Sequence, residues 1–237
     1  MFKSEDNIIK FISLPPGLEE RKEILPRKYK NFLPDWWTNI PNSSEEIKTV
    51  RNCPGISDLF SNIYVVPMWQ NTSITFLPKE EISVTYEEDA FAFPEWSLHP
   101  NSQMIDHAEV FMGDRQVTHT LKIVSPWAIV TPKGYSVLQI PLFYSMNPDY
   151  TPMAGIVDTD IFHESNIPTM LHSNNEMIYF KKGTPLVGYI PFKREKFQET
   201  VMGYDKEVFD LLIQHGETFV DGIAEGNSYR KMQKGNI

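Results

Sequence analysis

The sequence contains a single cysteine, Cys53, so a disulfide within the chain is excluded. It has no run of about 18 apolar residues, the length that a membrane-spanning helix needs. It also does not open on a charged and then apolar leader. We therefore expect a protein that does not enter a membrane and stays in the cytoplasm. A component of a virion that assembles in a host cytoplasm would show the same features.

Basic residues are scarce relative to acidic ones. The chain has 22 lysines and arginines against 31 aspartates and glutamates, which gives a formal net charge of −9 and a pI near 5.2. A protein that binds nucleic acid neutralises phosphates with a basic surface. The acidic balance therefore predicts that nucleic acid is not a partner.

The composition favours β-structure over a helical bundle. The 18 prolines interrupt long helices and bound short strands. Aromatic residues make up 13% of the chain, and these side chains suit a pleated, half-buried surface. A hydrophobic content of 41% over 237 residues is enough for a substantial core. We expect a mainly β protein, built as a β-barrel or jelly roll.

The patterning divides the chain into three parts. Residues 1–54 form a proline-rich N-terminal arm with one short helical candidate at Leu18–Ile24. Residues 55–203 form the β-barrel or jelly-roll core, and residues 204–237 form a C-terminal helix and tail. The helix is predicted over Asp205–Phe219, where Val208, Leu211 and Leu212 share one face.

Within the core, apolar, β-branched and alternating runs predict the strands. These runs cover residues 63–68, 73–76, 82–86, 117–124, 127–130, 135–142, 154–157, 168–172, 177–180 and 186–192. Long loops are predicted between them at residues 91–106 and 146–153. The best-patterned stretch is Trp127 to Phe192.

Part of that stretch carries motifs of a known family. The run Ala154 to Asp160 reads AGIVDTD, Glu176 to Phe192 reads EMIYFKKGTPLVGYIPF, and Pro132 to Leu142 reads PKGYSVLQIPL. Residues 132–192 thereby resemble the core of the dUTPase family, at its third motif, its fourth motif and the strand before its second. The resemblance implies a dUTPase-like β-barrel, self-association, and a role for Asp158 in orienting the attacking water. Asp158 and Asp160 alternate along a strand, so their carboxylates share one face.

Other positions depart from the same family. Where its second motif offers arginine and serine to the phosphates, this chain has Pro141-Leu142-Phe143-Tyr144-Ser145. Thr184 and Pro185 replace the aspartate and arginine of the fourth motif, and a glycine-rich C-terminal lid is missing. Leucine and phenylalanine cannot replace an arginine that clamps phosphate. The departures predict that the barrel is shared and the nucleotide chemistry is not.

A second resemblance covers more of the chain. It rests on the proline-rich arm with its Trp-Trp pair, on Val50 to Gln70, on the stretch PWAIVTPKGYSVL, and on VDTDIF. These segments together are similar to an uncharacterised family of phage proteins, notably from cyanophages, and of bacterial proteins. This resemblance implies a phage origin and no particular reaction.

Candidate ligand-binding residues are aromatic. Trp36 and Trp37 lie between two prolines, and Trp127 and Tyr135 lie in the predicted core. Aromatic faces can stack on a base, a sugar or a partner, and the four rings are candidates for one concave surface. For Trp36 and Trp37, the alternative is that both indoles cap the barrel and hold the arm in place.

Metal ligands are a further possibility. His107-Ala108-Glu109 has the His-x-Glu spacing of an iron site with two histidines and one carboxylate, and His163 or His172 would complete it. Asp160, His163 and Glu164 could instead hold a divalent cation. The sequence identifies no cofactor.

Two hypotheses for the function follow. The first is a non-catalytic β-barrel with a binding or structural role, as a phage-encoded accessory factor or virion component. Its partner would be a second copy of the chain or another phage protein. The second is a metal-dependent enzyme, either a nucleotide hydrolase that uses Asp158 and Asp160 or an iron oxygenase that uses His107 and Glu109.

Overall fold

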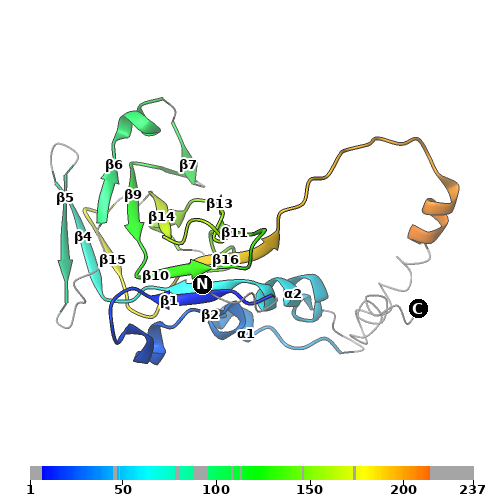
Figure 1. The fold of residues 1–237 in the computed structure, drawn as a ribbon, viewed down its shortest axis with the longest axis horizontal. Helices are drawn as coiled ribbons and strands as arrows, with labels where there is room; N and C mark the ends of the chain where they lie inside the picture. The colour runs from blue at the N-terminus through cyan, green and yellow to red at the C-terminus, as the bar shows by residue number, and fades with distance from the viewer. Residues whose placement is uncertain are drawn as a thin grey trace. The chain divides into compact units, whose positions relative to one another are not determined.

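The computed structural model describes residues 7–44, 47, 49–77, 81–87, 96–107, 109–112, 114–145, 147–172 and 175–213. The chain divides into two compact units. The first comprises Met1–Lys28 and Ile63–Arg194, and the second comprises Tyr29–Asn62 and Glu195–Ile237. All sixteen strands assigned in the described residues belong to the first unit (Figure 1).

A five-stranded antiparallel sheet forms the centre of the first unit. Its order is β13 (Gly155–Val157), β11 (Tyr135–Ile140), β16 (Pro185–Lys193), β3 (Tyr64–Pro67) and β2 (Arg27–Lys28). In its register Gln139 lies between Gly155 on β13 and Tyr189 on β16.

A four-stranded antiparallel sheet has the order β12 (Tyr150–Pro152), β14 (Asn166–Leu171), β9 (His119–Val124) and β6 (Trp96–His99). Burial alternates along β14, where Ile167, Thr169 and Leu171 are buried and the residues between them are less so. Such alternation places successive side chains on opposite faces of the sheet.

Three smaller sheets complete the first unit. One has the order β15 (Met177–Phe180), β4 (Thr72–Leu77) and β5 (Glu81–Tyr86). The others are two-stranded and join β1 (Lys10–Ser13) to β10 (Trp127–Val130), and β7 (Phe111–Met112) to β8 (Arg115–Gln116). Short 3₁₀ helices occur in this unit as η1 (Leu18–Glu20), η2 (Lys22–Ile24), η5 (Asn101–Gln103) and η6 (Ile105–His107).

The core of the first unit is one cluster of buried apolar side chains drawn from several sheets. Its members include Trp69, Trp127, Leu121, Ile123, Ile167, Phe180 and Tyr189. Gly188 on β16 allows the segments of this core to pack closely, because a Cβ built there would lie 2.7 Å from Ile63 Cγ2. Residue 188 therefore has room for a hydrogen atom and not for a methyl group.

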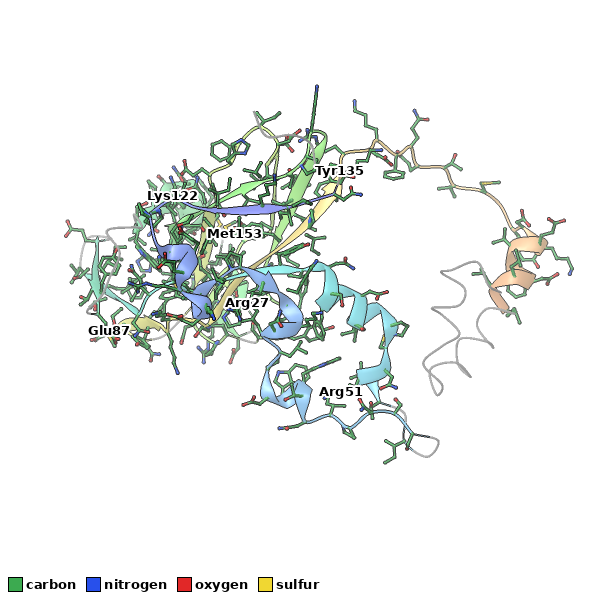
Figure 2. The ribbon with its side chains drawn as sticks, turned by 60° about the horizontal axis from the view of Figure 1, so that its bottom comes forward. Arg27, Arg51, Glu87, Lys122, Tyr135 and Met153 are labelled. Carbon is green, nitrogen blue, oxygen red and sulfur yellow. The ribbon has the colours of Figure 1, made fainter. Side chains whose placement is uncertain are left out.

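The second unit is helical. It contains η3 (Tyr29–Asn31), α1 (Asp35–Thr38), η4 (Val50–Asn52), α2 (Pro54–Asn62) and a helix over residues 206–213. Pro54 begins α2, at a position where its missing N–H costs no hydrogen bond. The ring of Phe60 meets those of Tyr29 and Trp37 edge-on, at 5.0 and 4.9 Å between centroids. Arg51 (labelled in Figure 2) donates to carbonyls at the end of α1.

The structure confirms the mainly β class, and Trp127–Val130 and Met177–Phe180 are strands with the predicted bounds. Two predicted loops are wrong in part, because β6 falls within residues 91–106 and β12 within 146–153. The arm contributes β1 and β2, which were not predicted. Each of these four segments is a strand because it pairs with another strand: β6 with β9, β12 with β14, β1 with β10 and β2 with β3. A pairing partner that is distant in the sequence leaves no local pattern in the strand itself.

The C-terminal helix is present over residues 206–213, one residue later than predicted, and residues 214–219 of its predicted range lie outside the described residues. Leu18–Ile24 forms two 3₁₀ turns rather than one α-helix. Among the residues described, no helix is both long and apolar enough to cross a membrane.

Candidate functional site

The aspartate pair lies directly after β13. The backbone carbonyl of Asp158 accepts hydrogen bonds from the N–H groups of Ile161 and Phe162, at 2.9 and 2.8 Å, so the chain turns sharply here. Both carboxylates then face the end of β16, where Arg194 follows the last strand residue.

Arg194 holds Asp160 with both arms of its guanidinium group. Nη1 donates to Oδ1 at 2.8 Å and Nη2 to Oδ2 at 2.5 Å. The backbone N–H of Gly134 donates to Oδ2 at 2.8 Å, and the Asp160 side chain is only 5% exposed. The hydrogen bonds from Arg194 lower the pKa of Asp160, and the N–H of Gly134 adds to the effect. Asp160 is therefore a fixed anion within a forked ion pair.

Asp158 is held less tightly. Its Oδ1 accepts a hydrogen bond from Ser136 Oγ at 2.6 Å and lies 3.0 Å from Arg194 Nη1. Ser136 and then Arg194 lower the pKa of Asp158. Two like charges on one face repel each other unless a cation lies between them, and here one guanidinium serves both carboxylates.

This ion cluster joins the ends of β11, β13 and β16. The sequence predicted that the two aspartates share a face, but it did not identify Arg194. The arginine lies 34 residues from Asp160 in the chain, so no local spacing connects them. Asp158 and Asp160 are not among the described residues that line the cavities at Leu142, Gln139 and Phe11.

The candidate metal ligands are dispersed. Within the described ranges, no three His, Cys, Asp or Glu side chains come close enough to hold a metal ion. His107 Nε2 lies 2.7 Å from the carbonyl oxygen of Ser102, and His163 Nδ1 lies 2.9 Å from that of Thr159. The structure thus does not bring His107, Glu109 and His163 together.

The four candidate aromatic residues have different environments. Trp127 is 2% exposed and belongs to the core cluster of the first unit. Trp37 is 5% exposed, whereas Trp36 is 41% exposed and meets Trp37 edge-on. Tyr135 donates a hydrogen bond from its hydroxyl group to Asn7 Oδ1 at 2.8 Å. Trp127 and Trp37 therefore offer no exposed ring face to a ligand.

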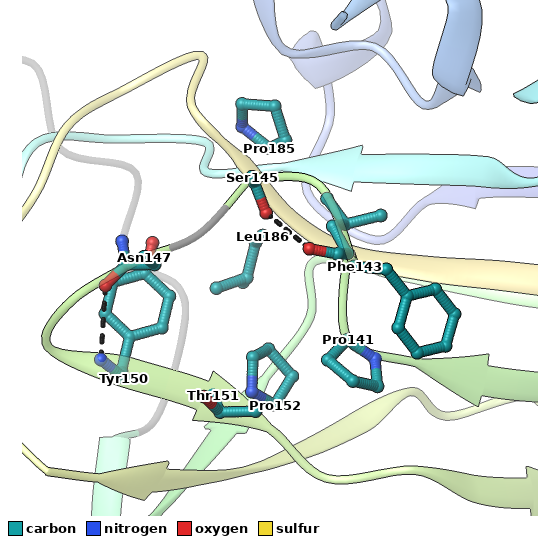
Figure 3. A pocket seen from close by; sticks show the side chains of 10 residues that line it. Pro141, Phe143, Ser145, Asn147, Tyr150, Thr151, Pro152, Pro185 and Leu186 are labelled. Carbon is teal, nitrogen blue, oxygen red and sulfur yellow. Dashed lines mark hydrogen bonds between the residues drawn. The ribbon is translucent and has the colours of Figure 1, made fainter. Parts of the chain in front are cut away.

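The segment at the position of the family's second motif lines an apolar cavity of about 220 Å³ (Figure 3). Pro141, Pro152, Pro185, Leu142, Leu186 and Phe143 form much of its wall. Ser145 at its edge donates a hydrogen bond to the carbonyl of Leu142 at 2.7 Å. Among the described residues that line it there is neither lysine nor arginine, so none of them would form an ion pair with a phosphate.

A second cavity, of about 450 Å³, lies in the first unit and is lined by residues of β9, β11, β13 and β14 and of the segment 99–104. We call it the Gln139 cavity. It is lined by Met104, Thr120, Gln139, Met153, Gly155 and Asn166, among others. A Cβ built on Gly155 would meet nothing within 4 Å, so the space beside Gln139 is open.

Among the polar groups at the Gln139 cavity, two buried atoms have no hydrogen-bond partner. Thr120 is 6% exposed, and its Oγ1 makes no hydrogen bond. The Oδ1 of Asn166 is likewise buried without a partner. Thr120 and Asn166 alternate with the core residues Leu121 and Ile167, so they face away from the core. Buried polar groups without partners are costly, and in native proteins they mark places where a water or a ligand binds.

Comparisons with known proteins give only distant matches. No family model matches the chain, and no curated protein matches it. Among solved structures, the chain is similar to a variant of the dUTPase from phage φ11 of Staphylococcus aureus, with 9% identity, a TM-score of 0.36, and coverage of 84% of this chain and 99% of the other. It is also similar to the dUTPase of Staphylococcus bacteriophage 80α, with 9% identity, a TM-score of 0.38, and coverage of 85% and 100%.

These neighbours are dUTPases, the family whose motifs residues 132–192 resemble. TM-scores of this size do not establish a common fold, so the mainly β class rests on the sheets described above.

Proposed function

We propose that this protein is a non-catalytic binding protein that takes a small, uncharged ligand in the Gln139 cavity. One observation carries the proposal: a cavity of about 450 Å³ with apolar walls and two buried, unpartnered polar atoms, Thr120 Oγ1 and Asn166 Oδ1. Ligand sites have this character, since apolar walls supply affinity and a few polar groups set orientation.

The lining residues indicate the charge of the ligand. They include methionine, proline, isoleucine and valine, and their polar members are histidine, threonine, glutamine and asparagine. The described residues that line the cavity include neither aspartate, glutamate, lysine nor arginine. An ion would lose its hydration there without gaining a partner. An uncharged heterocycle of one or two rings is the best match.

The aspartate pair supports binding rather than hydrolysis. Asp158 and Asp160 share the guanidinium of Arg194, and the Gln139 cavity is not lined by either of them. A carboxylate that orients an attacking water needs a free oxygen directed at the substrate. Both Asp160 oxygens are bound by Arg194, whereas Asp158, which is 52% exposed, engages Ser136 and Arg194 through Oδ1 alone and does not line the Gln139 cavity.

The test is a binding screen with a cavity-filling variant. The probes are 2-pyridone, benzimidazole and hypoxanthine, and saturation-transfer NMR reports contact. Gly155→Val directs a branched side chain into the open space at Gly155 and should abolish the signal. Gly203→Val is the matched control, because a Cβ there also meets nothing within 4 Å and Gly203 does not line the cavity. Absence of binding by all three probes, or binding that survives Gly155→Val, would contradict the proposal.

A further inference from the structure

A chain of buried hydrogen bonds leads from the core to the Gln139 cavity. Ser165 Oγ hydrogen-bonds the hydroxyl group of Tyr189, and that hydroxyl group donates to Gln139 Oε1 at 3.1 Å. Gln139 Nε2 in turn donates to the backbone carbonyl of Met153 at 3.0 Å. Met153, labelled in Figure 2, lines the cavity together with Gln139.

The members of this chain are enclosed. Tyr189 is fully buried, and Ser165 and Gln139 are each 3% exposed. Burial raises the pKa of Tyr189, so its hydroxyl group keeps its proton and remains able to donate. Such a network has little freedom to rearrange, because every broken hydrogen bond leaves a buried group without a partner.

The carbonyl of Met153 determines which way the Gln139 amide faces, and the hydroxyl group of Tyr189, which can donate or accept, anchors the oxygen end. The carbonyl of Met153 can only accept a hydrogen bond, so it requires the NH₂ end of the amide. The hydroxyl group of Tyr189 donates to the oxygen end. If the amide flipped, its oxygen would face the Met153 carbonyl, and both acceptors would lack a donor.

Each end of the Gln139 amide keeps bonding capacity. A side-chain amide has two N–H donors and two acceptor lone pairs, and the structure uses one of each. Gly155, which pairs with Gln139 across β11 and β13, leaves the adjoining space open. A flat ligand edge can therefore reach the amide.

We infer that Tyr189 is a positioning residue, which holds the Gln139 amide in one orientation so that the cavity selects a cyclic amide, with a carbonyl beside an N–H. The inference rests on the proposed function, because it assigns the ligand edge that the same cavity recognises. A purely structural role for Tyr189 would stabilise the core without affecting the choice of ligand.

The first test needs no ligand. In ¹⁵N-labelled protein, the side-chain amide signals of Gln139 are identified by their loss in Gln139→Met. We expect two separate signals that exchange slowly with solvent, and at least about fivefold faster exchange in Tyr189→Phe, because one hydrogen bond of about 1 kcal/mol is lost. Ser165→Ala leaves the bond from Tyr189 to Gln139 in place and should keep the slow exchange. Unchanged signals in Tyr189→Phe overturn the inference.

The second test measures selectivity. Wild-type protein should prefer 2-pyridone to N-methyl-2-pyridone, which lacks the N–H, by about fivefold or more, the value of one hydrogen bond. Tyr189→Phe and Gln139→Met should both reduce this preference to less than about twofold. Tyr150→Phe is the control, since Tyr150 is also buried, stacks on Phe180 and does not line the cavity.

The outcomes separate the two proposals. If neither pyridone nor the wider probe panel binds wild-type protein, the proposed function fails, and the exchange measurement still decides whether Tyr189 fixes the amide. If 2-pyridone binds and the preference survives in folded Tyr189→Phe, the binding function stands and the role of Tyr189 is refuted. If Tyr189→Phe does not fold, Gln139→Met alone must remove the preference for the inference to hold.

Discussion

Substitution of Gly188 by alanine should destabilise the first unit. Gly188 pairs with Ile140 on β11 and with Val65 on β3, at the centre of the five-stranded sheet. An added methyl carbon would lie 2.7 Å from Ile63 Cγ2, 3.0 Å from Leu142 Cδ2 and 3.3 Å from Ile140 Cγ1. Real Cβ atoms do not approach carbon this closely, so Ile63 has to move within a close-packed core.

The expected cost is that of overpacking, about 1–3 kcal/mol in the free energy of unfolding. For a chain of this size, each kcal/mol lowers the melting temperature by about 2–4 °C, so the total shift is roughly 2–12 °C. Differential scanning calorimetry measures the shift. Gly155→Ala on β13 is the matched control, because the new Cβ meets nothing within 4 Å. Equal melting temperatures for Gly188→Ala and Gly155→Ala would refute the reasoning.

Two further predictions concern polar groups. Thr120→Val should leave the free energy of unfolding unchanged or raise it by up to about 1 kcal/mol in urea titrations, because Thr120 Oγ1 has no hydrogen bond to lose; a clear loss of stability would contradict the description of the cavity. At pH values above about 4, the ordinary pKa of aspartate, Asp160→Asn should destabilise the protein. Arg194 lowers the pKa of Asp160 in the folded state, so the stabilisation is present above that value and is lost as the pH falls through the lowered pKa. Unfolding curves at pH 7 and pH 3 should therefore differ between wild type and variant mainly at pH 7, and an equal difference at both would count against the ion pair.

The strands that the sequence predicted best are those whose own pattern shows burial. Trp127–Val130 is apolar throughout, and it lies in the core. Lys10–Ser13 in the arm has no comparable pattern and becomes a strand because β10 pairs with it. Pairing depends on residues more than a hundred positions away, so local propensity could not reveal it.

The candidate site was predicted only in part. The sequence predicted a shared face for Asp158 and Asp160 from strand alternation, but both residues lie in a turn after β13, and their common partner Arg194 is contributed by another strand end. Gln139 was not identified, although a glutamine between Leu138 and Ile140 in an apolar strand is a signal of a buried polar group. Its amide hydrogen-bonds to Tyr189 and Met153, which only the folded sheet brings to it.

The most direct test of the central claim is a methyl NMR titration with 2-pyridone. Binding in the Gln139 cavity should shift the methyl signals of Thr120, Ala154 and Met153, which line it, while those of Leu142 and Leu186 in the apolar cavity stay unchanged. Shifts at Leu142 and Leu186 alone, or no saturable shift at any of these methyl groups, would contradict the account.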